Sequence, residues 1–392
     1  MEQIINKIKS SDVIMGDNKT KLARVAINGF GRIGRAFLKV ALASDKLEVI
    51  CVNDLGDIKN MAYLLSNDTV YKKSNFEVSV EEVSETEKYL IIKNIYVNDK
   101  NKNIKLENGG EVNTSFKKVE DKKIKFISQR DATLLPWKEN NIDIVIESTG
   151  LFTSYDKANV HIMSGAKRVI ISAPAKSGED ASINGETVLM SVNEDKLKTC
   201  NITSNASCTT NASSPLIAIM DESIGIEKAM LNTVHAYTAS QGIVDGPNKK
   251  DYREGRAAAQ NIVPSSTGAA IAVGKVFTQI DGKFDGIAMR VPVPAGSIVD
   301  ITFIAKRNTT AEEVNDILRS AAKEKRWENI FSASDEELVS SDIQGSHFAS
   351  IVDLKMTRVV GGNLVKVLGW YDNEMGYTHT LVTHAEKVAE LI

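Results

Sequence analysis

The chain carries at positions 28–35 the sequence Asn28-Gly29-Phe30-Gly31-Arg32-Ile33-Gly34-Arg35, which has the glycine spacing G-x-G-x-x-G. The apolar run 21–27 precedes it and predicts a strand, and residues 36–42 predict a helix. In a dinucleotide-binding turn the first glycine makes the bend, the second lets the backbone approach the pyrophosphate, and the third lets helix and strand pack closely. The spacing alone is weak evidence, but its place between a strand and a helix predicts a dinucleotide site.

A second apolar run at 47–52 predicts the next strand, which ends at Asn53-Asp54. Asp54 follows Gly34 by about 20 residues, where the dinucleotide fingerprint has an acid that binds the ribose hydroxyls. The negative charge of Asp54 would repel the 2′-phosphate of NADP. The sequence therefore predicts NAD as the cofactor.

Further strands are expected at 142–147 and 167–172, and the first ends at Ser148-Thr149-Gly150, a turn suited to passing near a cofactor. Strands that alternate with helices predict a doubly wound parallel sheet, in which ligands bind at the carboxyl ends of the strands. Residues 75–127 show the period-two pattern of short antiparallel strands. Within that region, 99–105 and 107–112 are expected to be exposed turns.

The second half of the chain has a different pattern. It predicts strands at 225–237, 286–293, 297–305 and 365–370, and helices at 268–277, 310–324 and 377–392. Thr310 and Glu313 have the spacing of a capping box at the start of the helix 310–324. We therefore expect an α/β protein: a Rossmann-type doubly wound parallel sheet plus an α+β catalytic domain with a mixed or antiparallel sheet.

Three parts of the chain are expected. Residues 1–21 form an N-terminal extension that we expect to be poorly ordered, since it lacks the apolar core and cleavage site of a secretory signal. Residues 22–207 and 373–392 form the NAD-binding Rossmann domain. Residues 208–372 form the catalytic domain, which also carries the oligomer contacts.

Composition narrows the class of protein. The 392 residues are 42% hydrophobic and 25% charged, with a net charge of −3, as in an ordinary soluble globular protein. This balance predicts no nucleic-acid or membrane partner, and no run approaches the length of a membrane span. Three cysteines, an odd and sparse set, argue against a disulfide framework and for a reducing compartment, the cytoplasm.

One cysteine lies among small polar residues in the stretch Ser204-Asn205-Ala206-Ser207-Cys208-Thr209-Thr210-Asn211. Residues 212–220 behind it predict the start of a helix. The positive end of a helix dipole lowers the pKa of a thiol, and the thiolate is the nucleophilic form. Because a small buried cysteine is the commoner case, the interpretation of Cys208 as a nucleophile depends on partners elsewhere in the chain.

A thiolate nucleophile needs a base. His235 is the leading candidate because it alone among the histidines lies at a predicted strand end bordered by small polar residues. The other histidines are expected to be structural: His161, His347, His379 and His384. No histidine and cysteine have metal-ligand spacing, so no metal is expected.

Two arginines and a helix start are candidate anion sites. Arg290 lies between Met289 and Val291 in a predicted strand, so its charge needs a buried or site-facing partner. Its planar guanidinium can bind two phosphate oxygens at once. Residues 265–270 place hydroxyls and free N–H groups at a helix start, which favours an anion. Arg253 is a further candidate, with a surface ion pair as the alternative.

These features together describe a definite chemistry. The thiolate adds to an aldehyde, a hydride leaves to NAD, and a thioester remains on Cys208. Phosphate then attacks the thioester and releases an acyl phosphate.

From about Leu22 to Ile392 the chain closely resembles the phosphorylating glyceraldehyde-3-phosphate dehydrogenase family. The run 204–211 is the most specific of the matching stretches, which are 27–35, 148–152, 204–211, 235–238, 245–256, 264–275, 290–294 and 370–377. The resemblance implies that glyceraldehyde 3-phosphate and inorganic phosphate are the substrates, and that the protein is a homotetramer.

The resemblance also implies roles for single residues. Cys208 would be the nucleophile, His235 would activate it and act as acid and base, and Asn373 would fix the nicotinamide carboxamide. The expected substrate and phosphate contacts are Ser207, Thr209, Thr238, Arg253, Thr267, Gly268 and Arg290. The expected cofactor contacts are Gly29, Phe30, Gly31, Arg32, Ile33, Gly34, Asp54, Leu55, Arg130, Ser148 and Asn373.

Some positions depart from the family pattern. Ala212 stands where the family usually has a second cysteine, and regions 75–127 and 177–186 are longer than usual. Two other functions remain open: an erythrose-4-phosphate dehydrogenase that hydrolyses its thioester, and an NAD-binding protein without catalysis. The hydroxyl groups of Ser207 and Thr267 favour phosphate as the acceptor, and the complete catalytic set speaks against a non-catalytic protein.

Overall fold

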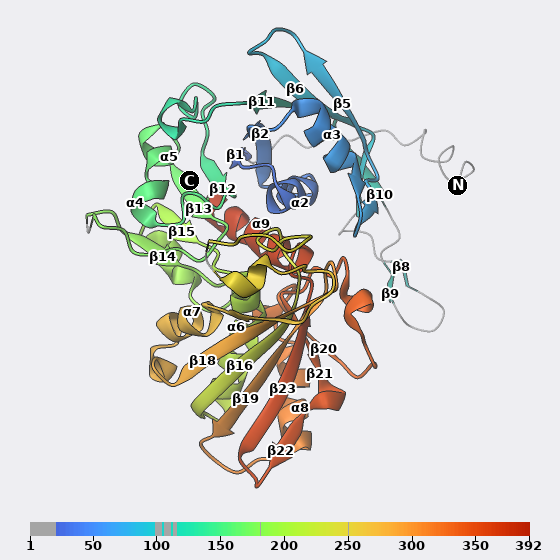
Figure 1. Ribbon diagram of the computed structural model, residues 1–392, viewed down its shortest axis with the longest axis vertical. Coiled ribbons are helices and arrows are strands. Elements are labelled where there is room, and N and C mark those ends of the chain that lie inside the picture. Colours follow the sequence, from blue (N-terminus) through green and yellow to red (C-terminus); the bar gives the residue numbers. More distant parts are fainter. Residues whose placement is uncertain (1–20, 99–103, 106–110, 113–115, 181, 250) are drawn as a thin grey trace.

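The computed structural model describes residues 21–98, 104–105, 111–112, 116–180, 182–249 and 251–392. The expected N-terminal extension therefore lies, apart from Lys21, outside the described residues. Two large sheets dominate the described chain, one of nine strands and one of eight (Figure 1). Three two-stranded ladders accompany them.

The nine-stranded sheet confirms the predicted doubly wound parallel sheet. Its order is β14 (Gly185–Thr187), β15 (Ile202–Ser204), β13 (Arg168–Ile171), β12 (Ile144–Glu147), β1 (Ala23–Asn28), β2 (Leu47–Asn53), β11 (Lys122–Ile127), β6 (Lys88–Lys93) and β5 (Glu77–Glu82). The strands from β14 to β11 are parallel, and β6 and β5 continue the sheet antiparallel. Its helices are α2 (Arg32–Ala41), α3 (Ile58–Ser66), α4 (Tyr155–Ala158), α5 (Val160–Met163) and α9 (Met375–Ala389).

Alternation along the central strands explains why this sheet is covered on both faces. Val25 and Ile27 of β1 join the large hydrophobic cluster that contains α2, whereas Ala26 between them joins a second cluster on the opposite face. In β12, Ile144 likewise joins the first cluster and Val145 joins the second. Successive strand residues point to opposite faces, so a strand apolar at every position must be buried on both.

The region 75–127 contributes short strands, as its period-two pattern predicts. The antiparallel ladders pair β3 (Asn67–Asp68) with β4 (Lys72–Lys73), β7 (Ile95–Asn98) with β10 (Phe116–Val119), and β8 (Ile104–Lys105) with β9 (Glu111–Val112). The exposed turns expected at 99–105 and 107–112 are thus wrong at residues 104–105 and 111–112, which form the paired strands β8 and β9. Residues 99–103 and 106–110 lie outside the described residues.

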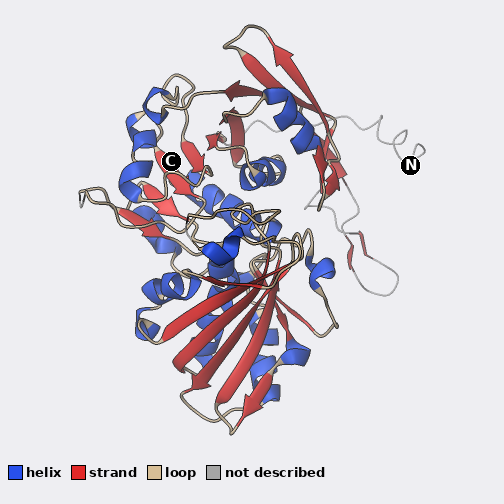
Figure 2. Cartoon of the chain, viewed as in Figure 1, coloured by secondary structure: helices blue, strands red, loops and turns tan. Residues whose placement is uncertain are grey.

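The second large sheet is mixed, as predicted. Its order is β17 (Val263–Ser266), β18 (Phe284–Val291), β16 (Ile226–Ala236), β19 (Ser297–Ala305), β23 (Leu364–Tyr371), β21 (Ser350–Asp353) and β20 (Phe331–Ser334), with β22 (Arg358–Val360) also pairing with β23. Only the pairs β16–β18 and β20–β21 are parallel. Figure 2 shows the strands fanning out with helices behind them. These helices are α6 (Cys208–Ser223), α7 (Ala269–Val276) and α8 (Ala311–Ala321).

Short 3-10 helices complete the description, at Ala132–Leu134, Glu194–Lys198, Tyr252–Gly255, Thr278–Ile280, Lys325–Trp327, Ser340–Ile343 and Leu354–Met356.

Several helix boundaries differ from the sequence expectation, among them α2, which begins at Arg32, and α9, which spans Met375–Ala389. α6 begins at Cys208 and not at Ala212, because Ser207 caps it and accepts a hydrogen bond from the Thr210 N–H. α8 ends at Ala321, and only half of its expected capping box forms. Thr310 accepts from the Glu313 N–H, but the Glu313 carboxylate binds Thr309 and Arg307 instead of returning to Thr310.

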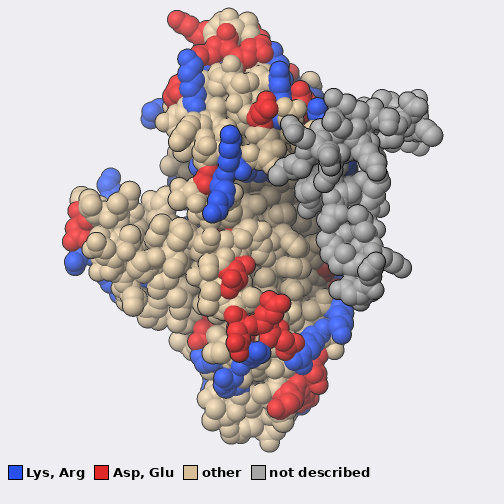
Figure 3. Space-filling model, turned by 90° about the vertical axis from the view of Figure 1, so that its right-hand side faces the viewer, with Lys and Arg blue, Asp and Glu red and all other residues tan. Residues whose placement is uncertain are grey.

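Charged side chains of both signs are interspersed at the two ends of the face in Figure 3, with a largely uncharged band between them. Within the described residues, none of the helices combines the length and apolar character that a membrane span requires.

Candidate active site

Cys208 is the first residue of α6, and a constrained turn delivers it there. Ala206 has φ of +55°, in the left-handed region that residues with a side chain rarely adopt. The Tyr377 hydroxyl donates to the Ala206 carbonyl at 3.1 Å, and the Asn211 amide donates to the Asn205 carbonyl at 2.7 Å. These bonds hold the turn and therefore the position of the thiol.

His235 lies beside this thiol, at the end of β16. Its Nε2 is 3.3 Å from the Cys208 Sγ, and its Nδ1 is 2.7 Å from the Ala236 carbonyl oxygen. A carbonyl can only accept, so this contact fits a hydrogen on Nδ1 and a lone pair on Nε2 facing the thiol. Arg290 Nη1, which can only donate, meets the same Nδ1 and fits the opposite tautomer. His235 Nε2 is thus within hydrogen-bonding reach of the Cys208 sulfur.

The imidazole of His235 is held from the side by Tyr371. The two rings meet edge to face, with their centroids 5.9 Å apart. The buried Tyr371 hydroxyl lies 3.0 Å from the Thr209 hydroxyl and 2.7 Å from that of Thr233. The sequence prediction missed Tyr371, whose only signal was its place at the end of a predicted strand.

The substrate-free site favours a neutral thiol and a neutral imidazole. Burial raises the pKa of the Cys208 thiol above its usual value, although the charge of Arg290 acts in the opposite direction. Burial, together with Arg290, lowers the pKa of His235 to about 3. The expectation that the helix start lowers the thiol pKa is therefore wrong for this state, because desolvation outweighs the helix. A neutral His235 is nonetheless the form that can take a proton.

Arg290 lies next to His235 because β18 and β16 pair in parallel with these two residues in register. Its Nη1 is 2.5 Å from His235 Nδ1 and 3.4 Å from the Ala236 carbonyl oxygen. The Nε of Arg290 is buried and has no partner among the described residues. The sequence predicted that the charge of Arg290 needs a partner. Nη1 has such contacts, whereas Nε has none among the described residues.

The remaining expected anion contacts lie in three segments, 207–210, 238–240 and 267–269. The Ser207 hydroxyl lies 2.7 Å from that of Thr210, and the Thr238 hydroxyl lies 3.0 Å from that of Ser240. The Thr267 hydroxyl accepts from the Ala269 N–H at 3.2 Å at the start of α7. Gly268 is the N-cap of α7 and has open space beside its Cα.

Arg253 is paired with a neighbouring acid. Its side chain is exposed and forms an ion pair of 3.0 Å with Asp251, two residues before it. Among the described residues, no hydrogen bond or ion pair joins Arg253 to Cys208, His235 or Arg290. The structure therefore shows the surface ion pair that the sequence left as the alternative.

The glycine turn after β1, residues 29–34, has the shape of a dinucleotide-binding turn and is called the cradle below. Gly29 has φ of +95°, and a Cβ there would lie 2.7 Å from the Ser148 carbonyl carbon. A Cβ on Gly34 would lie 2.1 Å from the Gly29 carbonyl oxygen, so helix and strand approach too closely for any side chain. Gly31 faces open space. The turn therefore fits a pyrophosphate at the start of α2.

Asp54 and Ser148 border this turn. The Asp54 carboxylate accepts from the Phe30 N–H at 2.7 Å and from the Gly56 N–H at 2.8 Å, and each oxygen keeps a lone pair for a ribose hydroxyl. Ser148 donates to the Gly29 carbonyl at 2.7 Å. Leu55 and Arg130 are exposed, and Ile33 packs against the core of the sheet.

A buried polar network beneath the cradle was missed by the sequence prediction. The Asn28 amide donates to Glu147 at 2.6 Å, and His161 Nε2 lies 3.0 Å from the same carboxylate oxygen. The Trp137 indole donates to His161 Nδ1, so His161 donates from Nε2 to Glu147. The other Glu147 oxygen accepts from the Thr149 N–H. This network rigidifies the carboxyl ends of β1 and β12. Its one signal in the sequence was Glu147, an acid at the end of a predicted buried strand.

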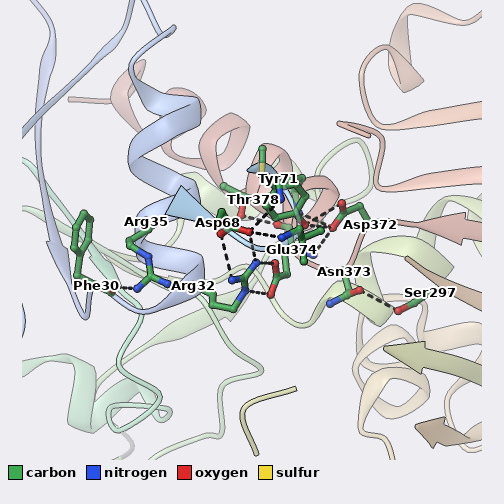
Figure 4. Close-up of polar contacts among 12 residues, drawn as sticks. Phe30, Arg32, Arg35, Asp68, Tyr71, Ser297, Asp372, Asn373, Glu374 and Thr378 are labelled. Atoms are coloured by element: carbon green, nitrogen blue, oxygen red, sulfur yellow. Dashed lines mark hydrogen bonds and ion pairs between the residues drawn. The ribbon is translucent and has the colours of Figure 1, made fainter. Parts of the chain in front are cut away.

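Asn373 lies between β23 and α9 and is buried. Its Oδ1 accepts a hydrogen bond of 3.1 Å from the Ser297 hydroxyl on β19 (Figure 4). Its Nδ2 donates to none of the described residues, so one amide donor is available to a ligand.

Comparison with known proteins agrees with this geometry. The family model for the glyceraldehyde 3-phosphate dehydrogenase C-terminal domain matches residues 207–373. The model for the NAD binding domain of the same family matches residues 23–111 and 105–155.

Full-length relatives match as well. The glyceraldehyde-3-phosphate dehydrogenases of Streptomyces coelicolor and Geobacillus stearothermophilus are each 43% identical to this chain, over 92% and 93% of it and 96% and 98% of their own lengths. That of Clostridium pasteurianum is 40% identical over 94% of this chain and 99% of its own length. The chain therefore belongs to the glyceraldehyde-3-phosphate dehydrogenase family.

Proposed function

We propose that this enzyme oxidises glyceraldehyde 3-phosphate with NAD and phosphorylates the product to 1,3-bisphosphoglycerate, through a hemithioacetal and a thioester on Cys208. The observation that carries the proposal is the 3.3 Å contact between the Cys208 sulfur and Nε2 of His235. The family membership supplies the substrate class.

His235 manages the protons of this reaction. Its Nε2 takes the thiol proton as the sulfur bonds to the aldehyde carbon, and returns that proton to the oxygen to complete the hemithioacetal. NAD, when bound, accepts the hydride that leaves the hemithioacetal carbon. Nε2 takes the hydroxyl proton in the same step, which leaves the thioester. Attack by phosphate on the thioester carbon then breaks the carbon–sulfur bond and releases the Cys208 thiolate.

Two anion sites hold the phosphate groups. Arg290, with its free buried Nε, would bind one of them together with Thr238 and Arg253. Arg253 can contribute only by turning away from Asp251, since its present ion pair occupies the guanidinium. Ser207, Thr209, Thr267 and Gly268 would bind the other, where the N-terminus of α7 favours negative charge.

The cradle residues hold the cofactor. The turn Gly29–Gly34 would take the pyrophosphate, and Asp54 would accept from the ribose hydroxyls. Asn373 would donate from Nδ2 to the carboxamide of the nicotinamide. Leu55, Arg130 and Ser148 complete the contacts that the family resemblance implies.

We also propose the division into a cofactor part, 22–207 with 373–392, and a catalytic part, 208–372. In chain order the last strand of the nine-stranded sheet is β15, which ends at Ser204, and α9 packs against α2 of the same part. Both observations support these bounds. A cytoplasmic homotetramer is proposed as well. The face of the mixed sheet opposite α6 and α7 exposes Met230 and Ile287, as a face covered by another subunit would.

Initial rates of NADH formation test the proposed function. Glyceraldehyde 3-phosphate and erythrose 4-phosphate should each be offered with NAD or NADP, with and without inorganic phosphate. We expect the fastest turnover with glyceraldehyde 3-phosphate, NAD and phosphate together. A rate that is independent of phosphate would overturn the phosphorylating assignment.

A further inference from the structure

A closed ring of polar contacts lies beside Asn373 and joins three distant segments of the chain (Figure 4). The segments are the start of α2 with Arg32, the β3–β4 turn with Asp68 and Tyr71, and the residues before α9, Asp372 and Glu374. Asn373 lies in the chain between two members of the ring.

The buried carboxylate of Asp372 is the centre of this ring. It is fully inaccessible to solvent, and it accepts from the N–H groups of Gly345, Glu374 and Met375 at 2.8–2.9 Å. The Tyr71 hydroxyl completes its shell, 2.7 Å from one oxygen and 3.0 Å from the other. A buried carboxylate needs all of these donors, so removing one weakens the hold on the peptide that carries Asn373.

The other half of the ring holds Tyr71 in place. Asp68 accepts from the N–H groups of Val70 and Tyr71, which shapes the β3–β4 turn. Arg32 pairs with Asp68 at 3.2 Å and binds both oxygens of Glu374. The Arg32 guanidinium also lies 5.9 Å from the centre of the Tyr71 ring. The turn is thus fastened to the glycine-rich cradle on one side and to the start of α9 on the other.

Burial and the Asp372 carboxylate both raise the pKa of the Tyr71 phenol, so it remains a donor across the range in which the enzyme can be assayed.

We propose that Tyr71 is a positioning residue for the nicotinamide end of the cofactor: its hydroxyl fixes Asp372, and Asp372 fixes the Asn373 amide. The inference rests on the proposed role of Asn373 toward the carboxamide. It adds a residue of the β3–β4 turn, far from the catalytic sheet in sequence, to the cofactor site. The Tyr71 hydroxyl bonds to Asp372, whereas its ring lies beside Arg32, so removing the hydroxyl alone should affect the part of NAD that Asn373 contacts.

The test compares two ligands that differ at that end. NAD carries the nicotinamide, whereas ADP-ribose has the same adenosine, pyrophosphate and second ribose without it. Titration calorimetry of Tyr71→Phe should give a dissociation constant for NAD that is raised about fivefold, while that for ADP-ribose changes by less than about twofold. The KM for NAD should rise in parallel, and the KM for glyceraldehyde 3-phosphate should not.

Tyr63→Phe is the matched control, because Tyr63 is an exposed tyrosine on the neighbouring helix α3. Asn373→Ala tests the underlying assignment and should show the same selectivity for NAD over ADP-ribose, more strongly. If Asn373→Ala shows it and Tyr71→Phe does not, the inference is overturned and the proposed function stands. If neither shows it, the role of Asn373 falls and the inference with it. Equal weakening of both ligands by Tyr71→Phe, or a lower melting temperature alone, would mean a merely structural role and would overturn it too.

Discussion

The Cys208 sulfur lies 3.3 Å from His235 Nε2, while His235 Nδ1 lies 2.7 Å from the carbonyl oxygen of Ala236. The carbonyl contact and the edge of the Tyr371 ring fix the orientation of the imidazole, so Nε2 faces the sulfur before any substrate arrives. Burial favours the neutral form of both partners, and the Arg290 charge acts in the same direction on His235 but in the opposite direction on Cys208.

Replacing the nucleophile should remove catalysis and leave cofactor binding. In Cys208→Ser the hydroxyl is a far weaker nucleophile at neutral pH, so we expect kcat to fall by about three orders of magnitude. The dissociation constant of NAD should be unchanged by calorimetry. Cys200→Ser is the control, because Cys200 is buried just before β15 and its sulfur contacts the Ile202 carbonyl. Retention of activity in Cys208→Ser would contradict the mechanism.

The pH dependence of thiol alkylation reports the pKa of Cys208. Since burial raises this pKa, the rate with iodoacetamide in the ligand-free enzyme should keep rising as pH increases through the alkaline range. The Arg290 charge lowers the same pKa, so Arg290→Gln should shift the profile to still higher pH and slow alkylation at any given pH.

Arg307→Gln is the control for the alkylation experiment, as Arg307 is an exposed arginine paired with Glu313. A profile for Arg290→Gln that is unmoved, or that shifts to lower pH, would show that Arg290 does not act on the thiol.

The charge of Asp54 should set the choice between NAD and NADP. Asp54→Asn keeps an oxygen that can accept from the Phe30 N–H but removes the negative charge. We expect the ratio of kcat/KM for NADP to that for NAD to rise about tenfold, since charge repulsion across a few ångströms near a protein surface is worth 1 kcal/mol or more. Asp45→Asn, at an exposed acid after α2, should leave the ratio unchanged. No change in Asp54→Asn would remove Asp54 from the ribose site.

His384 should make the enzyme less stable in acid. It is fully buried between Thr203 and Asn205, and burial lowers its pKa to about 3. Below about pH 6.5 the unfolded chain binds a proton at this position and the folded chain does not, so the free energy of unfolding falls by about 1.4 kcal/mol per pH unit as pH decreases.

The matching variant is His384→Asn, compared with the parent by urea unfolding at fixed protein concentration between pH 8 and about 4.5. The variant should be less stable at neutral pH, because a buried hydrogen bond is lost. Its free energy of unfolding should fall less steeply as pH decreases, and the two slopes should differ by about 1.4 kcal/mol per pH unit, the value for one bound proton. Equal slopes for both proteins would show that His384 binds its proton in the folded state.

Local pattern was enough to predict the four neighbouring strands β1, β2, β12 and β13 of the first sheet, whereas β14 and β15 were not predicted. The glycine turn, the apolar runs of β1 and β2, and Asp54 lie within a single strand–helix–strand unit, so neighbours in sequence determine their structure. The contact of His235 with Arg290 follows from strand pairing, which no local pattern reveals.

Features that depend on long-range packing were not predictable from the sequence. The pKa of Cys208 depends on what surrounds the thiol, and the sequence showed only the helix start. Tyr71 and Asp372 are separated by 301 positions, and a tyrosine in a polar turn carries no sign of a buried acid as its partner. Arg253 illustrates the reverse case, since its sequence context allowed either a site or an ion pair and the fold shows the ion pair.

The most direct test of the account is a single mixing experiment in which the enzyme meets glyceraldehyde 3-phosphate and NAD without phosphate, and NADH is followed by its absorbance. If Cys208 forms a thioester that only phosphate removes efficiently, NADH should appear in a burst stoichiometric with the chain and then nearly stop. Addition of phosphate should restart steady turnover. Continuous turnover without phosphate, or a burst of the same size in Cys208→Ser, would contradict the account.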